Sequence, residues 1–168
     1  HLHAPQYTFR ASGMDLELLD WLNTYTFPQE ARYEDTEFAK EAYSIFAEDM
    51  KKSPNTRACI FGTLHVPATE ILMEQLDKTG IKAMVGKVNM DRNGSPQLQE
   101  ESAQVSADAT VQWIKDTLDK FENVKPILTP RFTPSCSDAL MEKLSEIQKK
   151  YHLPMQSHLS ENFGEIAW

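Results

Sequence analysis

Strand-like and helix-like segments alternate along the whole of this 168-residue chain, and that order limits the folds open to it. Four segments are typical of buried strands, at 57–65, 81–90, 124–129 and 154–159. Helices are expected at 14–25, at 35–52 and at 67–80. A fourth helix is expected to end at about residue 121, and a fifth to begin at Ser137. Such alternation favours a parallel sheet with crossover helices. Periodicity alone leaves open whether that sheet closes into a (β/α)8 barrel or stays open and doubly wound.

Apolar spacing and helix punctuation support these assignments. Within 35–52, apolar side chains recur at every fourth residue, namely Phe38, Ala42, Phe46 and Met50. Pro67 suits the first turn of its helix, Gly80 suits the end, and Ser137 suits the N-cap of the last helix. The pair Phe27-Pro28 is expected to end the first helix, because proline lacks a backbone donor and crowds the preceding turn.

Composition and charge exclude several functional classes. The chain is 40% hydrophobic and 25% charged, as in an ordinary globular protein, so disorder is not expected. A net charge of −8 disfavours nucleic-acid binding, which needs a basic face. No apolar run approaches the ~20 residues that span a bilayer, so no membrane contact is expected. The two cysteines, Cys59 and Cys136, form no disulfide framework, and the expected location is therefore the cytoplasm.

Two histidine motifs lie near opposite ends of the chain. The opening HLH places His1 and His3 at i and i+2, which on a strand point to the same face. An HLSE stretch adds His158 and, three residues on, Glu161. Together they suggest a hydrolytic metal site in which zinc activates a water and Glu161 carries its proton. Either motif alone is weak, because His-x-His arises by chance and a terminal HLH also occurs in cloning remnants.

Polar candidates fall where the expected strands end. Those at or just past the carboxyl end of a strand are His65, Asn89, Arg131 and His158. The carboxyl ends of parallel strands meet at one edge, and in a (β/α)8 barrel that edge carries the active site. His65 has no ligand spacing around it and is not expected to bind a metal.

Five stretches carry a resemblance to a known family. They are HLHAPQY at 1–7, LNTYTFPQE at 22–30, KVNMDRN at 87–93, PRFTPSCS at 130–137 and QSHLSEN at 156–162. In order and spacing along the whole chain, they closely resemble the guanine deaminases of the amidohydrolase superfamily. The resemblance implies a (β/α)8 TIM-type barrel in place of an open sheet. Residues 1–168 would supply about its first five β/α units, counting the strand that ends at His3, with the closing strands absent.

The resemblance also implies an activity and a cofactor. The expected reaction is the hydrolytic deamination of guanine to xanthine and ammonia, with one zinc ion in each active site. His1, His3 and His158 would be the metal ligands, and Glu161 the proton shuttle beside His158. Similar deaminases complete the zinc shell with an aspartate from the last strand and add a histidine from strand six. Neither has a counterpart here. The full-length protein is expected to be a homodimer.

Substrate contacts are implied at six positions, namely His3, Gln6, Arg131, Phe132, His158 and Glu161. The side-chain amide of Gln6 both donates and accepts, so it can pair with a purine edge. The guanidinium of Arg131 suits the O6 acceptor of guanine, which adenine lacks, and Phe132 can stack on the purine. Without the family, a polar turn residue, a surface salt bridge and a core aromatic would be the simpler interpretations.

The sequence leaves two alternatives open. The first is another aminohydrolase of the superfamily, acting on a triazine or a modified purine. The second is a non-catalytic fragment that needs the rest of its barrel and exposes the edges of its outer strands. A two-metal site is not expected, because Lys87 does not lie in the strand from which a bridging lysine comes.

Overall fold

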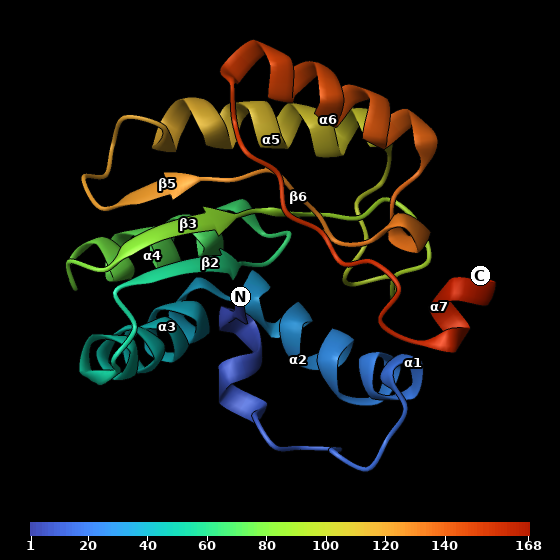
Figure 1. Cartoon of the computed structure of the whole chain (residues 1–168), viewed down its shortest axis with the longest axis horizontal. Helices are drawn as coiled ribbons and strands as arrows, with labels where there is room; N and C mark the ends of the chain where they lie inside the picture. The colour runs from blue at the N-terminus through green and yellow to red at the C-terminus, as the bar shows by residue number, and fades with distance from the viewer.

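The fold is a parallel sheet flanked by helices, described for residues 1–168 by a computed structural model. Its strands β1 (Leu2–His3), β2 (Arg57–Phe61), β3 (Lys82–Gly86) and β5 (Val124–Pro126) are hydrogen-bonded in that order. A second parallel pair, β4 (Val88–Asn89) and β6 (Thr129–Pro130), follows β3 and β5 along the chain. Because all pairings are parallel, the carboxyl ends of the strands share one edge (Figure 1).

The strand expected at 154–159 is present only as isolated bridges. These parallel bridges are Leu128↔Met155 and Phe132↔His158. The His158 N–H donates to the Arg131 oxygen at 3.1 Å, so the segment lies beside β6. It therefore has the predicted place and direction without the continuous ladder of a strand.

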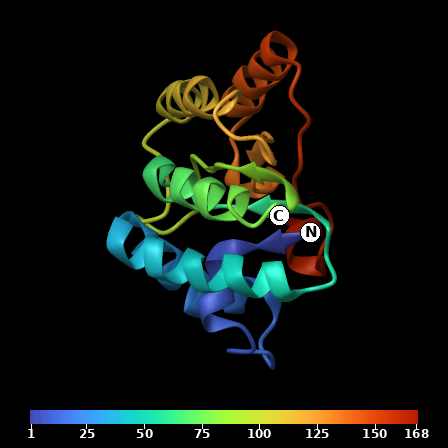
Figure 2. The ribbon, with the colours of Figure 1, turned by 90° about the vertical axis from the view of Figure 1, so that its left-hand side faces the viewer.

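The four long helices follow the order of the strands. They are α3 (Thr36–Lys52), α4 (Val66–Asp77), α5 (Ala103–Thr117) and α6 (Asp138–Tyr151). Consecutive helices pack together, and Figure 2 shows them succeeding one another along the sheet. Asp35 caps α3 by accepting the Glu37 N–H at 2.9 Å, and Ser137 caps α6 by accepting the Leu140 N–H at 3.1 Å. The predicted helix at 35–52 and the predicted N-cap are thus confirmed.

The prediction that Phe27-Pro28 ends the first helix is wrong. Helical structure runs on through α1 (Leu18–Trp21), the π-helical turn η2 (Leu22–Thr26), α2 (Phe27–Ala31) and the 3-10 turn η3 (Arg32–Glu34). In the π turn, the Phe27 N–H donates to the Leu22 oxygen five residues back. This wider turn relieves the crowding that proline causes, and Pro28 lies in the first turn of α2, where a missing donor costs little. The helix also begins at Leu18 instead of residue 14.

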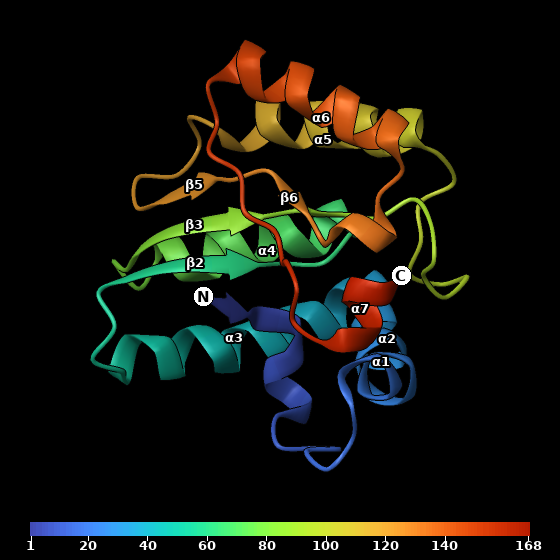
Figure 3. The same cartoon turned by 45° about the vertical axis from the view of Figure 1, so that its right-hand side comes forward.

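Short elements complete the edge of the sheet at which the strands end. They are the 3-10 turns η1 (Ala4–Phe9) and η4 (Thr133–Ser135) and the helix α7 (Phe163–Ala167). Figure 3 shows α7 lying against α1 and α2, and a Cβ added at Gly164 would lie 2.9 Å from Leu19 Cδ1. None of the helices combines the length and the apolar character needed to cross a bilayer.

The strand expected at 81–90 divides at Lys87. A Cβ built on Gly86 would lie 1.7 Å from Thr129 Oγ1, so the two chain segments approach too closely for any side chain there. Lys87 is buried and forms an ion pair with Glu100, whose other oxygen accepts a backbone N–H at 3.2 Å. Burial lowers the pKa of Lys87, and the Glu100 charge opposes that shift. Lys87 therefore anchors the loop after β4.

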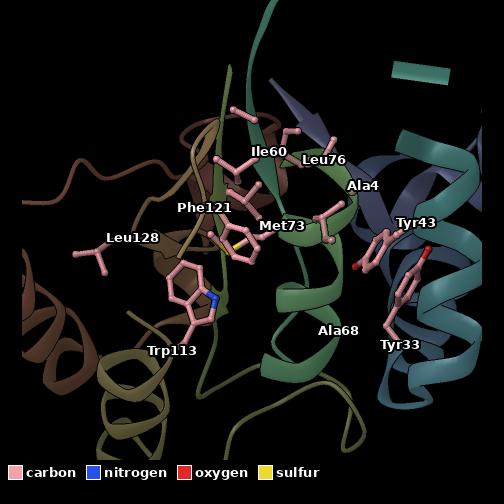
Figure 4. Close-up of a cluster of buried hydrophobic side chains, with 14 of the residues drawn as sticks. Ala4, Tyr33, Tyr43, Ile60, Ala68, Met73, Leu76, Trp113, Phe121 and Leu128 are labelled. Carbon is pink, nitrogen blue, oxygen red and sulfur yellow. The ribbon is translucent and has the colours of Figure 1, made fainter. Parts of the chain in front are cut away.

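The main hydrophobic core lies between the sheet and the long helices. Figure 4 shows its labelled members, among them Ile60 of β2, Leu76 of α4 and Trp113 of α5. These three side chains are completely buried, and burial of Ile60 and of Leu76 each stabilises the fold by roughly 1.5–3 kcal/mol. A smaller cluster joins Leu22 of the π turn to Phe61 at the end of β2. The helical segment 18–34 is thereby packed onto the edge where the strands end.

We expect Gly86→Ala to lower the free energy of unfolding by roughly 1–3 kcal/mol or more, because the added methyl group overlaps Thr129. Thermal denaturation of the full-length protein measures this. Gly80→Ala is the control without a steric overlap: its Cβ meets open space, so its only cost is the backbone strain at φ +79°, roughly 1–2 kcal/mol. Equal melting temperatures for the two variants would contradict the close approach at Gly86.

Candidate active site

Three imidazoles converge at the carboxyl edge of the sheet. His3 lies in β1 with His1 just before it, and His158 lies in the bridge to Phe132. His3 Nε2 is 2.9 Å from His158 Nε2, which is 3.3 Å from His1 Nε2. Nitrogens bound tetrahedrally to one zinc ion would be separated by roughly 3.3 Å. The three ligand atoms lie within 4.8 Å of one another, so the cluster fits a single metal ion.

The backbone of Arg131 orients the His158 ring. Its carbonyl oxygen lies 2.7 Å from His158 Nδ1 and also accepts the His158 backbone N–H at 3.1 Å. A carbonyl only accepts, so His158 Nδ1 carries the proton and donates it. The Nε2 lone pair is then free and faces the other two histidines, which is the tautomer that binds a metal through Nε2.

Stacking holds His3, and its surroundings keep it neutral. Its ring stacks on Phe61 with 4.5 Å between centroids and on His158 with 4.9 Å. Burial, the Arg131 charge and the His158 ring hold the pKa of His3 well below its ordinary value. Neutral imidazole is the form that offers a lone pair to a metal ion.

A buried ion pair fixes the Arg131 side chain. Arg131 donates through Nη1 to Glu30 Oε2 at 2.5 Å and through Nη2 to Glu30 Oε1 at 3.2 Å. Gln6 Nε2 donates to Glu30 Oε1 at 3.2 Å and lies 3.2 Å from His3 Nδ1. The Arg131 guanidinium also lies over the Phe27 ring, 5.1 Å from its centroid. A continuous set of contacts therefore connects the histidine cluster to Arg131.

One cavity of about 230 Å³ contains every residue that the sequence proposed for the site. Its lining residues are His1, His3, Gln6, Leu18, Trp21, Leu22, Arg131, Phe132, His158 and Glu161. Polar groups line one part, while α1, the π turn and Phe132 supply apolar and aromatic walls. A small cavity with a few convergent polar groups suits a flat heterocycle better than a long or highly charged ligand.

The buried carboxylate of Glu165 holds the loop that carries Glu161. It accepts the Ser160 N–H at 2.9 Å and the Glu161 N–H at 2.6 Å. Asn162 caps α7 by accepting the Glu165 N–H at 2.8 Å, which fixes Glu165 in turn. The exposed Glu161 side chain is therefore mounted on a defined loop at the cavity.

Other polar candidates lie outside the cavity and have structural contacts. Asn89 is buried and donates to the hydroxyls of Ser106 at 2.8 Å and Thr110 at 2.7 Å. His65 lies half-buried at the start of α4, and burial lowers its pKa. Cys136 is buried and lines none of the cavity.

Sequence analysis missed Glu30, Glu165 and the apolar walls of the cavity. Glu30 lies in the LNTYTFPQE stretch that carried the family resemblance. It is buried together with Leu22, Thr26 and Phe27. A carboxylate on the buried side of a helix is a usable signal, but the assumed break at Pro28 hid it.

The comparisons with known proteins give the family. The whole chain, residues 1–168, matches the Amidohydrolase family, and the chain belongs to it. Its fold is the amidohydrolase fold of the TIM-barrel type, of which the chain covers a part. The predicted fold class is thus confirmed.

The relatives and solved structures are similar along almost all of this chain. Guanine deaminase of Rattus norvegicus is 46% identical over 167 residues, which are 99% of this chain and 37% of the rat protein. Guanine deaminase of Escherichia coli K12 is 33% identical, covering 100% of this chain and 38% of that protein. The crystal structure of guanine deaminase from C. acetobutylicum with bound guanine superposes with a TM-score of 0.94. The two sequences are 49% identical, and the match covers 99% of this chain and 40% of the C. acetobutylicum chain. The fold is shared by an adenosine deaminase from Xanthomonas campestris with bound zinc, which superposes with a TM-score of 0.77 at 19% identity. That match covers 99% of this chain and 36% of the adenosine deaminase. This chain spans about 37% of the length of the rat relative.

We expect Arg131→Met to lower the free energy of unfolding by roughly 3–5 kcal/mol, because it leaves the Glu30 carboxylate buried without its cation. The double variant Glu30→Met with Arg131→Met should recover most of that loss. Chemical denaturation of the full-length protein measures both. Lys78→Met breaks the exposed pair with Glu74 and should cost roughly 1 kcal/mol or less.

A double variant as unstable as Arg131→Met would contradict this account, because the loss would then come from packing instead of the unpaired charge.

Proposed function

We propose that the full-length protein containing this chain deaminates guanine by hydrolysis, consuming water and releasing xanthine and ammonia. The observation that carries the proposal is the meeting of Arg131 and Phe132 with three convergent histidines in one small cavity. The 46% identity to rat guanine deaminase and the guanine-bound relative support the same substrate. Residues 1–168 would form about the first five β/α units of the barrel.

One zinc ion is the proposed cofactor, held by His1, His3 and His158. The spacing of their Nε2 atoms and the tautomer that the Arg131 carbonyl imposes on His158 support this assignment. When bound, the metal ion would lower the pKa of a water molecule and so supply the nucleophile at neutral pH. Zinc suits imidazole ligands and four-coordinate sites that keep one position open.

Recognition of guanine is proposed for three side chains. Arg131 would donate to the O6 oxygen, where adenine carries an amino donor instead. Phe132 would stack on the purine, and Gln6 would pair with its edge. His3, His158 and Glu161 would complete the substrate contacts at the reacting carbon.

Glu161 is proposed to move the protons of the reaction. Water addition at C2 releases one proton, which a ring nitrogen takes up. When the C2–N bond breaks, the hydroxyl on C2 releases the second proton, which the leaving amine takes up as it departs as ammonia. One carboxyl group beside the reacting carbon can serve each of these steps in turn. Its place at the cavity, on a loop fixed by Glu165, supports this role.

We further propose a cytoplasmic homodimer that acts in purine catabolism. The free thiols of Cys59 and Cys136 suit a reducing compartment. The homodimer rests on the family resemblance alone. The alternative is another aminohydrolase of the superfamily, acting on a triazine or a modified purine. A substrate without an oxo acceptor would leave the donors of Arg131 unused.

We expect the full-length protein to convert guanine to xanthine, with Glu161→Gln lowering kcat by roughly 10²- to 10⁴-fold, because the amide cannot take up the proton. Ultraviolet absorbance follows xanthine, and a coupled assay follows ammonia. Glu146→Gln on the exposed side of α6 is the matched control and should retain full activity. Ammonia released from a triazine or an adenine derivative, and none from guanine, would overturn the proposal. A full-length protein that is inactive on guanine would likewise overturn it.

We expect His158→Asn to reduce the zinc bound after dialysis from about one ion per chain by tenfold or more, because one of three nitrogen ligands is lost. Atomic emission measures the metal in the full-length protein. His152→Asn is the matched control, since His152 is exposed at the end of α6 with φ +53°, which asparagine tolerates. Retention of zinc by His158→Asn would exclude His158 as a ligand.

A further inference from the structure

We propose that Glu30 is a specificity-determining positioning residue that makes the cavity select an uncharged oxo-purine over an anionic one. It does so by neutralising Arg131 and by fixing both Arg131 and Gln6. The inference deepens the proposed function and rests on it for the identity of the ligand. Glu30 itself lines none of the cavity, so it acts through the two residues that do.

The local fold explains why a carboxylate reaches this place. The buried residues of the segment recur as Leu22, Thr26 and Glu30, with Phe27 beside them. The extra residue of the π turn rotates everything after it by roughly 100° relative to an unbroken α-helix. That rotation, in front of Pro28, carries Glu30 toward the edge of the sheet at which the strands end.

The geometry leaves Arg131 little freedom. Both Glu30 oxygens accept from its two terminal nitrogens, at 2.5 and 3.2 Å, in a bidentate arrangement. The side chains are only 3% and 1% exposed, for Arg131 and Glu30 respectively. A guanidinium has five N–H groups, so three remain after this pairing and are directed by the fixed plane of the group.

Charge then decides which ligand fits. An isolated buried guanidinium would attract an anion strongly, because little solvent screens it. With Glu30 paired to it, the net charge of the pair is zero while the remaining N–H donors stay available. A neutral carbonyl acceptor can use those donors, whereas an anion must also face the Glu30 carboxylate.

Glu30 also orients the Gln6 amide. Its Oε1 only accepts, so it requires the NH2 group of Gln6 to face it, at 3.2 Å. The hydrogen bond to Glu30 uses Nε2, which leaves the Gln6 carbonyl oxygen as the acceptor for a ligand N–H. One carboxylate therefore sets a donor group on Arg131 and an acceptor group on Gln6, as an oxo-purine edge requires.

The experiment compares Glu30→Gln with the full-length wild type, using hypoxanthine as a neutral oxo-purine probe and urate as an anionic one. Calorimetry gives the dissociation constant of each probe, and steady-state kinetics gives KM and kcat for guanine. We expect Glu30→Gln to raise both the dissociation constant of hypoxanthine and the KM for guanine by roughly tenfold or more, because the charge-assisted hydrogen bonds of Glu30 are lost. Urate should bind more tightly, so the ratio of the two dissociation constants shifts by more than tenfold.

Glu34→Gln makes the same chemical change at an exposed position four residues along and should leave both constants unchanged. If Glu30→Gln weakens the binding of hypoxanthine and of urate equally, the role of Glu30 is merely structural and the proposal is overturned. Glu30→Asp keeps the charge and shortens the reach, so it should raise the KM for guanine and preserve the preference for hypoxanthine. Glu30→Asp is the deciding variant if Glu30→Gln fails to fold. An unchanged KM for guanine in Glu30→Asp, or a preference for urate over hypoxanthine, would overturn the proposal.

The two failures remain distinguishable. A wild type that does not deaminate guanine contradicts the proposed function, whatever the probes show. A wild type that deaminates guanine while the probe ratio stays constant in Glu30→Gln contradicts the role of Glu30 alone.

Discussion

Parallel pairing at the carboxyl edge of the sheet is the constraint on which the rest of the structure depends. His3 and His158 are 155 positions apart in the chain, yet their Nε2 atoms lie 2.9 Å apart. The register of β1 against β2 sets His3 beside Phe61, and the bridge at Phe132 sets His158. A shift of one residue would turn each side chain of the strand to the other face of the sheet. The apolar side chains packed against the helices therefore hold the register in place.

The buried Glu30–Arg131 pair is the second constraint, and packing energy alone does not account for it. Removing two charges from water is costly, and well-packed apolar residues often stabilise a protein as much as a buried pair does. The pair is better explained by what it positions. It fixes a planar donor group in the wall of a small cavity and holds the Gln6 amide through the same carboxylate.

Sequence reasoning predicted the parts of this molecule that local rules decide. The apolar spacing of α3 and the cap at Ser137 are properties of a single helix, and both were found. The break at Lys87 and the helix through Pro28 were missed, because each depends on partners distant in sequence or on a π turn. Glu30 was missed for the same reason, because its role depends on a contact with Arg131, which lies 101 residues away in the chain.

Arg131 serves the two halves of the site through chemically separate groups. Its backbone carbonyl orients the His158 ring, while its side chain pairs with Glu30 and faces the cavity. A side-chain substitution can therefore alter the recognition half while the carbonyl still directs His158. This separation follows from the parallel bridge, which fixes the backbone at 131–132 independently of the side chain. The fold thus places the proposed metal site and the proposed ligand site side by side, while separate groups of Arg131 serve each of them.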